Sequence, residues 1–318
     1  MLFITNRVLK QSHRSRAGRK ISFDFADNTA LPSLFFCRRN GQNDYTEILS
    51  TPFFDELRQS PASQVLLYLH GFNSQPEETI FPKAEKLQDL FDDKQANLVQ
   101  VVPLVWPCLG DESIVVKYYT DRDAADQSNV AFGRAMAKFT EWQSGRDDDE
   151  TLCVKRINVL AHSMGARVLR GALRWWSGEI LRFEPPQPFR NVFLPAADVV
   201  NQTLERGQDG YLITIAARNV VVYFASDDLA LRASKVANAT QVSRRLGHTG
   251  PYDMSKVPAH VFAKDCDDFN TDYDPPLGHS YFLDDEHGNP GKVFDDMFAA
   301  VHDGRVPGWR ERTRSFVL

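Results

Sequence analysis

The chain has 318 residues, of which 42% are hydrophobic and 25% charged, and its formal net charge is −5. This length permits a sizeable core, and the composition is ordinary for a globular protein. The negative net charge argues against a protein that binds nucleic acid over its whole surface, and no apolar run is long enough to predict a membrane span.

The cysteines and the N-terminal sequence both predict a reduced, cytoplasmic setting. The four cysteines, at positions 37, 108, 153 and 266, form no Cys-x-x-Cys pair. Their spacing fits neither a zinc site nor a disulfide framework. The first ten residues, "MLFITNRVLK", lack the long apolar segment and the cleavage site of a signal peptide.

The N-terminal part of the chain reads as strands and turns. Short β-rich runs predict strands over residues 2–6, 21–27 and 33–39. The basic stretch 10–20 between the first two is interpreted as a solvated loop, with an anion-binding role as the alternative. Residues 64–73, "QVLLYLHGFN", begin with the continuous apolar run of a strand buried on both faces of a parallel sheet.

From this strand onward, apolar runs alternate with helical periodicities. Further strands are predicted over residues 97–107, 156–160, 191–200, 219–226 and, as the last strand, 259–265. Helices are predicted over residues 79–93, around the apolar face of Phe132, Ala135, Phe139 and Trp142, and over 166–176, about 202–217 and 229–239. This alternation specifies an α/β fold, with a mostly parallel central sheet covered by helices on both faces. We predict a single domain, in which residues 1–63 complete the sheet, 64–285 form the core and 286–318 form a C-terminal helical tail.

The stretch "INVLAHSMGARVL", residues 157–169, runs from a buried strand through Ala-His-Ser-Met-Gly into an amphipathic helix. A strand that turns sharply through small-x-Ser-x-Gly into a helix is a nucleophile elbow, which exposes the serine hydroxyl at the tip of the turn. Ser163 would be that nucleophile, and the small residues Ala161 and Gly165 would prevent a collision across the turn. Ala161 departs from the usual glycine by one methyl group. The alternative is that Ser163 is a helix N-cap.

A second motif, "LYLHGFNS", ends the first buried strand. In acyl-transfer enzymes of this architecture, His-Gly-x at this place forms half of the oxyanion hole. The backbone N–H groups of Phe72 and Met164 would then be the two donors to a tetrahedral intermediate. The alternative is that Gly71 only makes a turn.

A serine nucleophile needs a base, and the base needs a carboxylate that orients it. In this architecture the acid follows a late strand, where "SDDLALRASK" supplies two aspartates. We favour Asp228 as the acid, followed by Asp227 and then Asp198. Either of the adjacent aspartates could instead cap the helix that follows.

The position along the chain selects the histidine. Of the eight histidines, three precede the acid, His260 begins the last predicted strand and two lie in the tail, which leaves His248 and His279. His279 follows the last predicted strand by about a dozen residues, where the base is expected, whereas His248 would line the site or be structural. Side chains that could line a substrate pocket are His70, Trp106, His162, Asp227 and His248. Core packing is the alternative for Trp106.

Two remaining segments bear on the site. The acidic loop 265–274 lacks the glycine and glutamate of an EF-hand in every register, so Asx-turns explain it better than calcium binding, and it could help to place His279. The short connection between residues 200 and 219 leaves no room for a large cap domain, and residues 233–258 are the remaining candidate for a lid.

Together these motifs resemble those of the α/β-hydrolases over roughly residues 64–283. The closer resemblance is to an uncharacterised bacterial branch of the esterase/lipase superfamily, carried by "LYLHGFN", "AHSMGARVL", "SDDLALRASK" and "GHSYF". In that branch the Asp before x-Ala-Leu is the presumed acid, which matches Asp228. The resemblance implies hydrolysis of an ester, thioester or amide through an acyl-enzyme.

The function predicted from these features is that of a carboxylesterase acting on a small-molecule acyl ester, with Ser163, His279 and Asp228 as its triad. It would require no cofactor and no metal, and it would bind no nucleic acid. Lipase, thioesterase and peptidase activities on the same residues are the nearest alternatives. A catalytically inactive binding module of the same fold is the alternative from another class.

Overall fold

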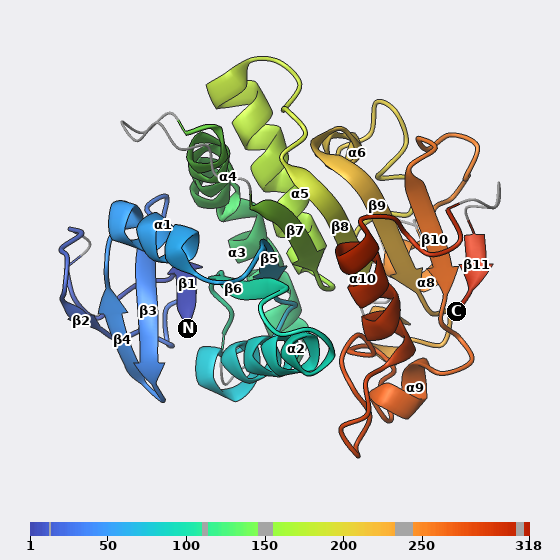
Figure 1. The fold of residues 1–318 in the computed structure, drawn as a ribbon, viewed down its shortest axis with the longest axis horizontal. Coiled ribbons are helices and arrows are strands. Elements are labelled where there is room, and N and C mark those ends of the chain that lie inside the picture. Colours follow the sequence, from blue (N-terminus) through green and yellow to red (C-terminus); the bar gives the residue numbers. More distant parts are fainter. Residues whose placement is uncertain (13, 110–113, 146–154, 233–243, 310–314) are drawn as a thin grey trace.

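The computed structural model describes residues 1–12, 14–109, 114–145, 155–232, 244–309 and 315–318. Within these residues the strands form one eleven-stranded sheet (Figure 1). The strands are β1 (Leu2–Thr5), β2 (Lys20–Ile21), β3 (Phe35–Gly41), β4 (Asp44–Glu47), β5 (Gln64–Leu69), β6 (Val99–Val105), β7 (Arg156–Ala161), β8 (Phe189–Pro195), β9 (Ala217–Phe224), β10 (Val261–Asp265) and β11 (Ser315–Val317).

The order of the strands across the sheet is β11-β10-β9-β8-β7-β5-β6-β1-β3-β4-β2. Every neighbouring pair from β11 to β1 is parallel, whereas β3, β4 and β2 are added at the other end by antiparallel pairing. The predicted mostly parallel α/β sheet is therefore confirmed. The strands of the first 63 residues belong to this same sheet.

The helices cover both faces of the sheet. They are α1 (Ser50–Gln59), α2 (Phe81–Lys94), α3 (Ile114–Gln127), α4 (Asn129–Ser144), α5 (Gly165–Trp175), α6 (Tyr211–Ala216), α8 (Leu246–Thr249), α9 (Asn270–Tyr273) and α10 (Lys292–Asp303), with π-helical segments η1 (Pro76–Ile80) and η2 (Trp176–Leu181). One core cluster joins the sheet to α1, α4 and α5 through residues such as Phe53, Phe132 and Leu169. The second core cluster joins the opposite face to α2 and α10 through residues such as Phe91 and Phe294.

Three sequence predictions fail locally. The helix expected over 202–217 is confined to α6, because Gly207 has a φ of +83° and residues 201–210 form turns. The strand expected over 21–27 shrinks to β2, since Asp24 Oδ1 accepts the N–H of Ala26 in a local turn. Residues 259–265 are not the last strand, because β11 pairs beyond β10 at the edge of the sheet.

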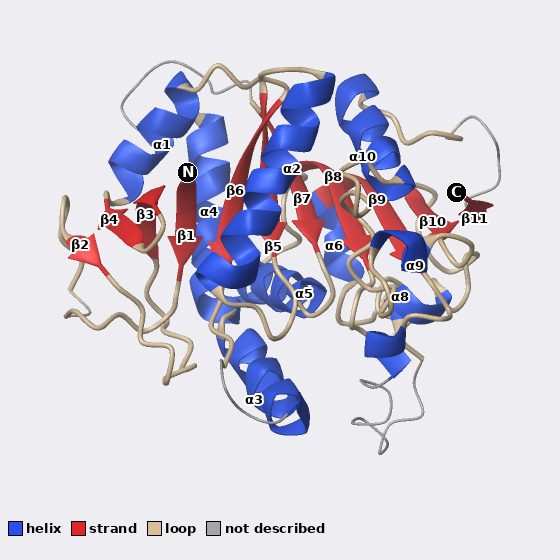
Figure 2. Ribbon diagram, turned by 90° about the horizontal axis from the view of Figure 1, so that it is seen from below, coloured by secondary structure: helices blue, strands red, loops and turns tan. Residues whose placement is uncertain are grey.

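Because the central strands are parallel, their C-terminal ends lie along one edge of the sheet. Figure 2 shows α3, α8 and α9, together with loops, at this edge. The N-terminal ends of the same strands lie at the opposite edge. In the part of the chain that the structure describes, no helix is both long and apolar enough to span a membrane.

Candidate active site

Ser163 occupies a strained turn between β7 and α5. Its φ of +53° lies in the left-handed region, which costs a residue with a side chain roughly 1–2 kcal/mol. The loop after β8 holds the turn in place, because Pro195 O accepts the N–H of Ser163 at 3.1 Å and Ser163 O accepts the N–H of Asp198 at 3.0 Å. The N-cap alternative is wrong, since Met164 is the N-cap of α5 and no side chain caps that helix.

Two glycines let the chain approach itself closely around Ser163. A Cβ on Gly165 would lie 2.5 Å from the carbonyl oxygen of Leu69, so a side chain there would push β5 away. A Cβ on Gly71 would lie 2.9 Å from His162 Nδ1 and 3.1 Å from Ser163 Cβ. The turn after β5 therefore packs directly against the turn that carries Ser163.

This packing places the turn that contains Phe72 next to the turn that contains Met164. Among the described residues, neither the N–H of Phe72 nor that of Met164 donates to another backbone or side-chain group. Met164 is only 1% exposed, and its N–H precedes α5, whose N-terminus carries a partial positive charge. The arrangement can stabilise an anion beside Ser163.

Asp228 and His279 meet at this edge of the sheet. Asp228 Oδ2 lies 2.7 Å from His279 Nδ1, and the aspartate is fully buried. Its other oxygen accepts the N–H of Leu231 at 2.9 Å, so the same carboxylate also caps the helical turn 229–232. Since a carboxylate only accepts, His279 Nδ1 carries the proton and Nε2 is left as the basic nitrogen.

Of the two adjacent aspartates, Asp227 is the one that Asn270 contacts. Its Nδ2 donates to Asp227 Oδ1 at 2.7 Å and to the carbonyl oxygen of Gly278 at 3.0 Å. Asp227 therefore accepts from Asn270, and this amide ties the loop of Asp227 to the loop that carries the histidine. Sequence reasoning missed Asn270, because nothing in the local pattern marks it.

The acidic loop fixes the backbone of the histidine. Asp274 Oδ2 accepts the N–H of His279 at 2.8 Å and that of Ser280 at 2.7 Å. The loop therefore helps to place His279 through the carboxylate of Asp274, a role that its position before the histidine had suggested. Among the described residues, no group of three or more His, Cys, Asp or Glu could hold a metal ion.

His162 connects the two turns. Its Nε2 lies 3.1 Å from the carbonyl oxygen of His279, and the rings of the two histidines are 4.8 Å apart. Burial and the neighbouring charge of His279 hold the pKa of His162 well below its usual value, so this ring is neutral. Among the described residues, Ser163 Oγ and His279 Nε2 have no hydrogen-bond partner, so no other protein group engages either atom.

A lysine that the sequence did not single out lies behind the histidine loop. Lys83 Nζ donates to Ser280 Oγ at 2.8 Å and lies over the ring of Phe282. Burial lowers the pKa of Lys83, while the charge of Asp274 opposes that shift. This lysine adds positive charge beside the loop of His279.

His70 and Trp106 support the site from behind instead of lining it. Both are fully buried, and their rings stack at 4.8 Å with an interplanar angle of 2°. The backbone N–H of Trp106 donates to His70 Nε2 at 3.2 Å, and His70 Nδ1 lies 2.8 Å from the carbonyl oxygen of Gly71. Desolvation lowers the pKa of His70 to about 3. Their prediction as pocket residues is corrected, because both side chains are enclosed and fix the Gly71 turn.

Asp198 is not the partner of His279. Its carboxylate lies 3.1 Å from Arg245 Nε and accepts a hydrogen bond from the Tyr118 hydroxyl at 2.9 Å. His248 lies half-buried in α8, which hydrogen bonds hold against the loop after β8. The role of His248 in the pocket stays a prediction. Of the candidate lid, residues 233–243 lie outside the described residues.

The comparison with protein families matches residues 47–287 to the model described as "Alpha/beta hydrolase of unknown function (DUF900)". The chain belongs to this α/β-hydrolase family. No curated protein matches it. Among solved structures, phospholipase PlaB from Legionella pneumophila is similar at 13% sequence identity with a TM-score of 0.27, over 68% of this chain and 40% of PlaB. The chain thus spans less than half the length of that relative.

Proposed function

We propose that this α/β-hydrolase is a serine carboxylesterase that cleaves small-molecule acyl esters through an acyl-enzyme. The observation that carries the proposal is the 2.7 Å contact between Asp228 Oδ2 and His279 Nδ1, beside a serine held at a positive φ. A buried carboxylate, an imidazole and a strained serine in this chain order are the components of a hydrolytic triad.

In the first half of the reaction, Ser163 Oγ attacks the ester carbonyl while His279 Nε2 takes up the hydroxyl proton. The carbonyl oxygen becomes an oxyanion, which the N–H groups of Phe72 and Met164 stabilise by roughly 3 kcal/mol each. When the tetrahedral intermediate collapses, the C–O bond to the alcohol breaks and His279 returns the proton to the leaving alcohol. An acyl group then remains on Ser163.

In the second half, a water molecule repeats the attack on the acyl-enzyme, with His279 again as the base. The acid is released and Ser163 recovers its proton. Asp228 keeps its charge throughout, holding the ring in one tautomer and stabilising the imidazolium. Because Asp228 is fully buried, its charge acts on the ring with little screening by water.

The proposal is tested by labelling with a fluorophosphonate probe, read by intact mass. We expect one adduct on the native chain and none on Ser163→Ala. Ser144→Ala is the matched control, since Ser144 is exposed and its hydroxyl bonds only Glu141 O; it should label like the native chain. Labelling that survives in Ser163→Ala would place the reactive group elsewhere. Absence of labelling in a folded native chain would favour the inactive binding module.

A panel of substrates separates the activities that share this chemistry. Short-chain and long-chain esters, thioesters and peptides should be compared by kcat/KM, and the proposal requires short acyl esters to be turned over best. A preference for long-chain esters would favour a lipase, and a preference for thioesters or peptides would favour the corresponding activity. The cytoplasmic location expected from the sequence stays a prediction.

A further inference from the structure

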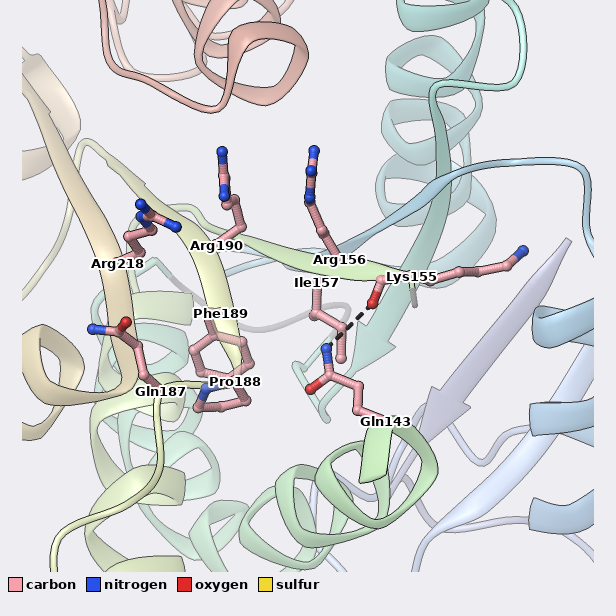
Figure 3. A pocket seen from close by; sticks show the side chains of 9 residues that line it. All are labelled: Gln143, Lys155, Arg156, Ile157, Gln187, Pro188, Phe189, Arg190 and Arg218. Carbon is pink, nitrogen blue, oxygen red and sulfur yellow. Dashed lines mark hydrogen bonds between the residues drawn. The ribbon is translucent and has the colours of Figure 1, made fainter. Parts of the chain in front are cut away.

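Three arginines gather at the opposite edge of the sheet, where β7, β8 and β9 begin. Arg156 is the first residue of β7, Arg190 the second of β8 and Arg218 the second of β9. The register pairs Phe189 with Ala217 and Asn191 with Asn219, which puts Arg190 beside Arg218. In Figure 3 the side chains of Arg156 and Arg190 run side by side in the same direction, with Arg218 next to them. We call these three residues the arginine cleft.

The cleft carries positive charge that no acid neutralises within the described residues. None of the three arginines forms an ion pair there. Asp303, a carboxylate close to Arg190 and Arg218, is hydrogen-bonded to His302 instead. By contrast, in the basic stretch 10–20, Arg19 pairs with Glu47 and Lys20 pairs with Asp44. The anion-binding alternative for that stretch therefore keeps fewer unpaired charges, and it stays a prediction.

Arg190 is only partly explained by the fold. Its Nη2 donates to the carbonyl oxygen of Gly304 at 3.1 Å, at the C-terminus of α10, where a cation is favourable. Its Nε, however, is buried without any hydrogen-bond partner. A buried donor without an acceptor costs roughly what a lost hydrogen bond costs. Burial and the charges of Arg156 and Arg218 also lower the pKa of Arg190.

The cleft opens into space that can hold a small ligand. A cavity of about 300 Å³ is lined by residues that include all three arginines, Lys155 and Gln187. An adjoining cavity of about 630 Å³ shares Arg190 and Arg218 and adds Arg305. Neither cavity is lined by Ser163, Asp228 or His279, so this space is separate from the candidate active site.

We propose that the arginine cleft is a binding site for a small phosphate-bearing polyanion. Guanidinium groups match phosphate oxygens with paired N–H donors, and several oxygens on one group can satisfy several arginines at once. Such a ligand would relieve the repulsion among the three cations and provide an acceptor for Arg190 Nε. A single carboxylate has fewer oxygens and less charge to share among three guanidinium groups.

The test uses the full chain and inorganic pyrophosphate as the probe, without divalent cations, in calorimetric titrations at constant ionic strength. We expect saturable binding to the native chain and at least tenfold weaker binding to the double variant Arg156→Gln/Arg218→Gln. Arg190 is left intact, since its contact with Gly304 could be needed for folding. Arg206→Gln, which removes an exposed arginine elsewhere, should bind within twofold of the native chain.

Three results would overturn the proposal. They are no binding of pyrophosphate to the native chain, equal binding to the native chain and the double variant, or an equal titration signal when chloride replaces pyrophosphate at the same ionic strength. Co-sedimentation with phosphatidylcholine vesicles, with and without phosphatidate, distinguishes a lipid headgroup from a free phosphate. Binding of either the free phosphate or the lipid headgroup supports the site if the double variant no longer shows that binding.

This inference does not depend on the proposed esterase activity. Fluorophosphonate labelling of the double variant should equal that of the native chain, because the cleft and Ser163 lie at opposite edges of the sheet. Loss of pyrophosphate binding with normal labelling would assign the effect to the cleft alone. A chain that binds pyrophosphate but never labels would retain this site and lose the proposed function.

Discussion

Charged side chains have different surroundings at the two ends of the central strands. At the C-terminal edge, Asp228 is fully buried, and both of its oxygens accept hydrogen bonds from the protein. At the N-terminal edge, Arg156 and Arg218 are exposed and have no acidic partner among the described residues. At the C-terminal ends of these strands, a buried charge therefore orients other groups of the protein. At the N-terminal ends, the arginine charges are available to a ligand. A parallel sheet provides two functional edges, and the loops determine which kind each becomes.

The largest expected effect separates the two aspartates at the C-terminal edge. Asp228→Asn should lower kcat/KM for an ester by about 10³- to 10⁴-fold. The asparagine oxygen can keep the bond from Leu231, but its amide would donate to His279 Nδ1 and move the ring proton to Nε2. The measurement is steady-state kinetics on the best ester of the panel.

Asp227→Asn is the matched control for that substitution. Its side-chain oxygen can still accept from Asn270, so we expect less than a tenfold loss of kcat/KM. Equal losses in both variants would mean that the loop, and not the contact between Asp228 and His279, carries the effect.

A medium effect should appear in the pH dependence of stability. The pKa of His70 in the folded chain is about 3, below the ordinary value of 6.5. Between these two pH values the unfolded chain binds a proton at this residue and the folded chain does not. The contribution of neutral His70 to the free energy of unfolding is therefore present above pH 6.5 and is lost as the pH falls from 6.5 toward 3. Between pH 7 and pH 5 the loss is about 2 kcal/mol.

Urea unfolding at both pH values checks this expectation. His70→Gln retains an acceptor for the N–H of Trp106 but cannot titrate, so its free energy of unfolding should fall less on acidification than that of the native chain. Identical pH slopes in the two proteins would show that other groups determine the acid sensitivity.

The smallest effect belongs to the arginine cleft. Arg156→Gln/Arg218→Gln removes like charges from around Arg190, so the free energy of unfolding should rise by about 0.5 kcal/mol at low salt. In 1 M NaCl the difference should vanish, because the screening length falls to roughly 3 Å. Arg206→Gln should show no comparable gain. If the double variant is less stable than the native chain at low salt, the inference that the three arginines repel one another is wrong.

Local sequence patterns predicted the parts of the fold and the site that depend on neighbouring residues. The six apolar runs from residue 64 onward predicted β5 to β10, because strands buried on both faces are continuously apolar. The turn that carries Ser163 was predicted because close backbone approach requires small residues such as Ala161 and Gly165 there. The positions of Asp228 and His279 along the chain predicted a pair that the structure places 2.7 Å apart.

Contacts between distant segments were beyond the sequence patterns. Asp228 contacts His279, whereas Asp227 accepts a hydrogen bond from Asn270, a residue that the pattern of the acidic loop 265–274 did not single out. The arginines at the start of β7, β8 and β9 each look like an ordinary polar residue at the end of a strand. Only the pairing of these strands puts their charges together. The basic stretch 10–20 was the more conspicuous pattern, yet Arg19 and Lys20 at its end are paired with acids.

The backbone of Ser163 has a consequence for the stability of the fold. A left-handed φ is free of strain only for glycine, so the serine at this position makes the fold less stable than it could be. A hydroxyl at the tip of this turn is therefore held at the expense of stability, because the residue that would relax the backbone, glycine, has no side chain.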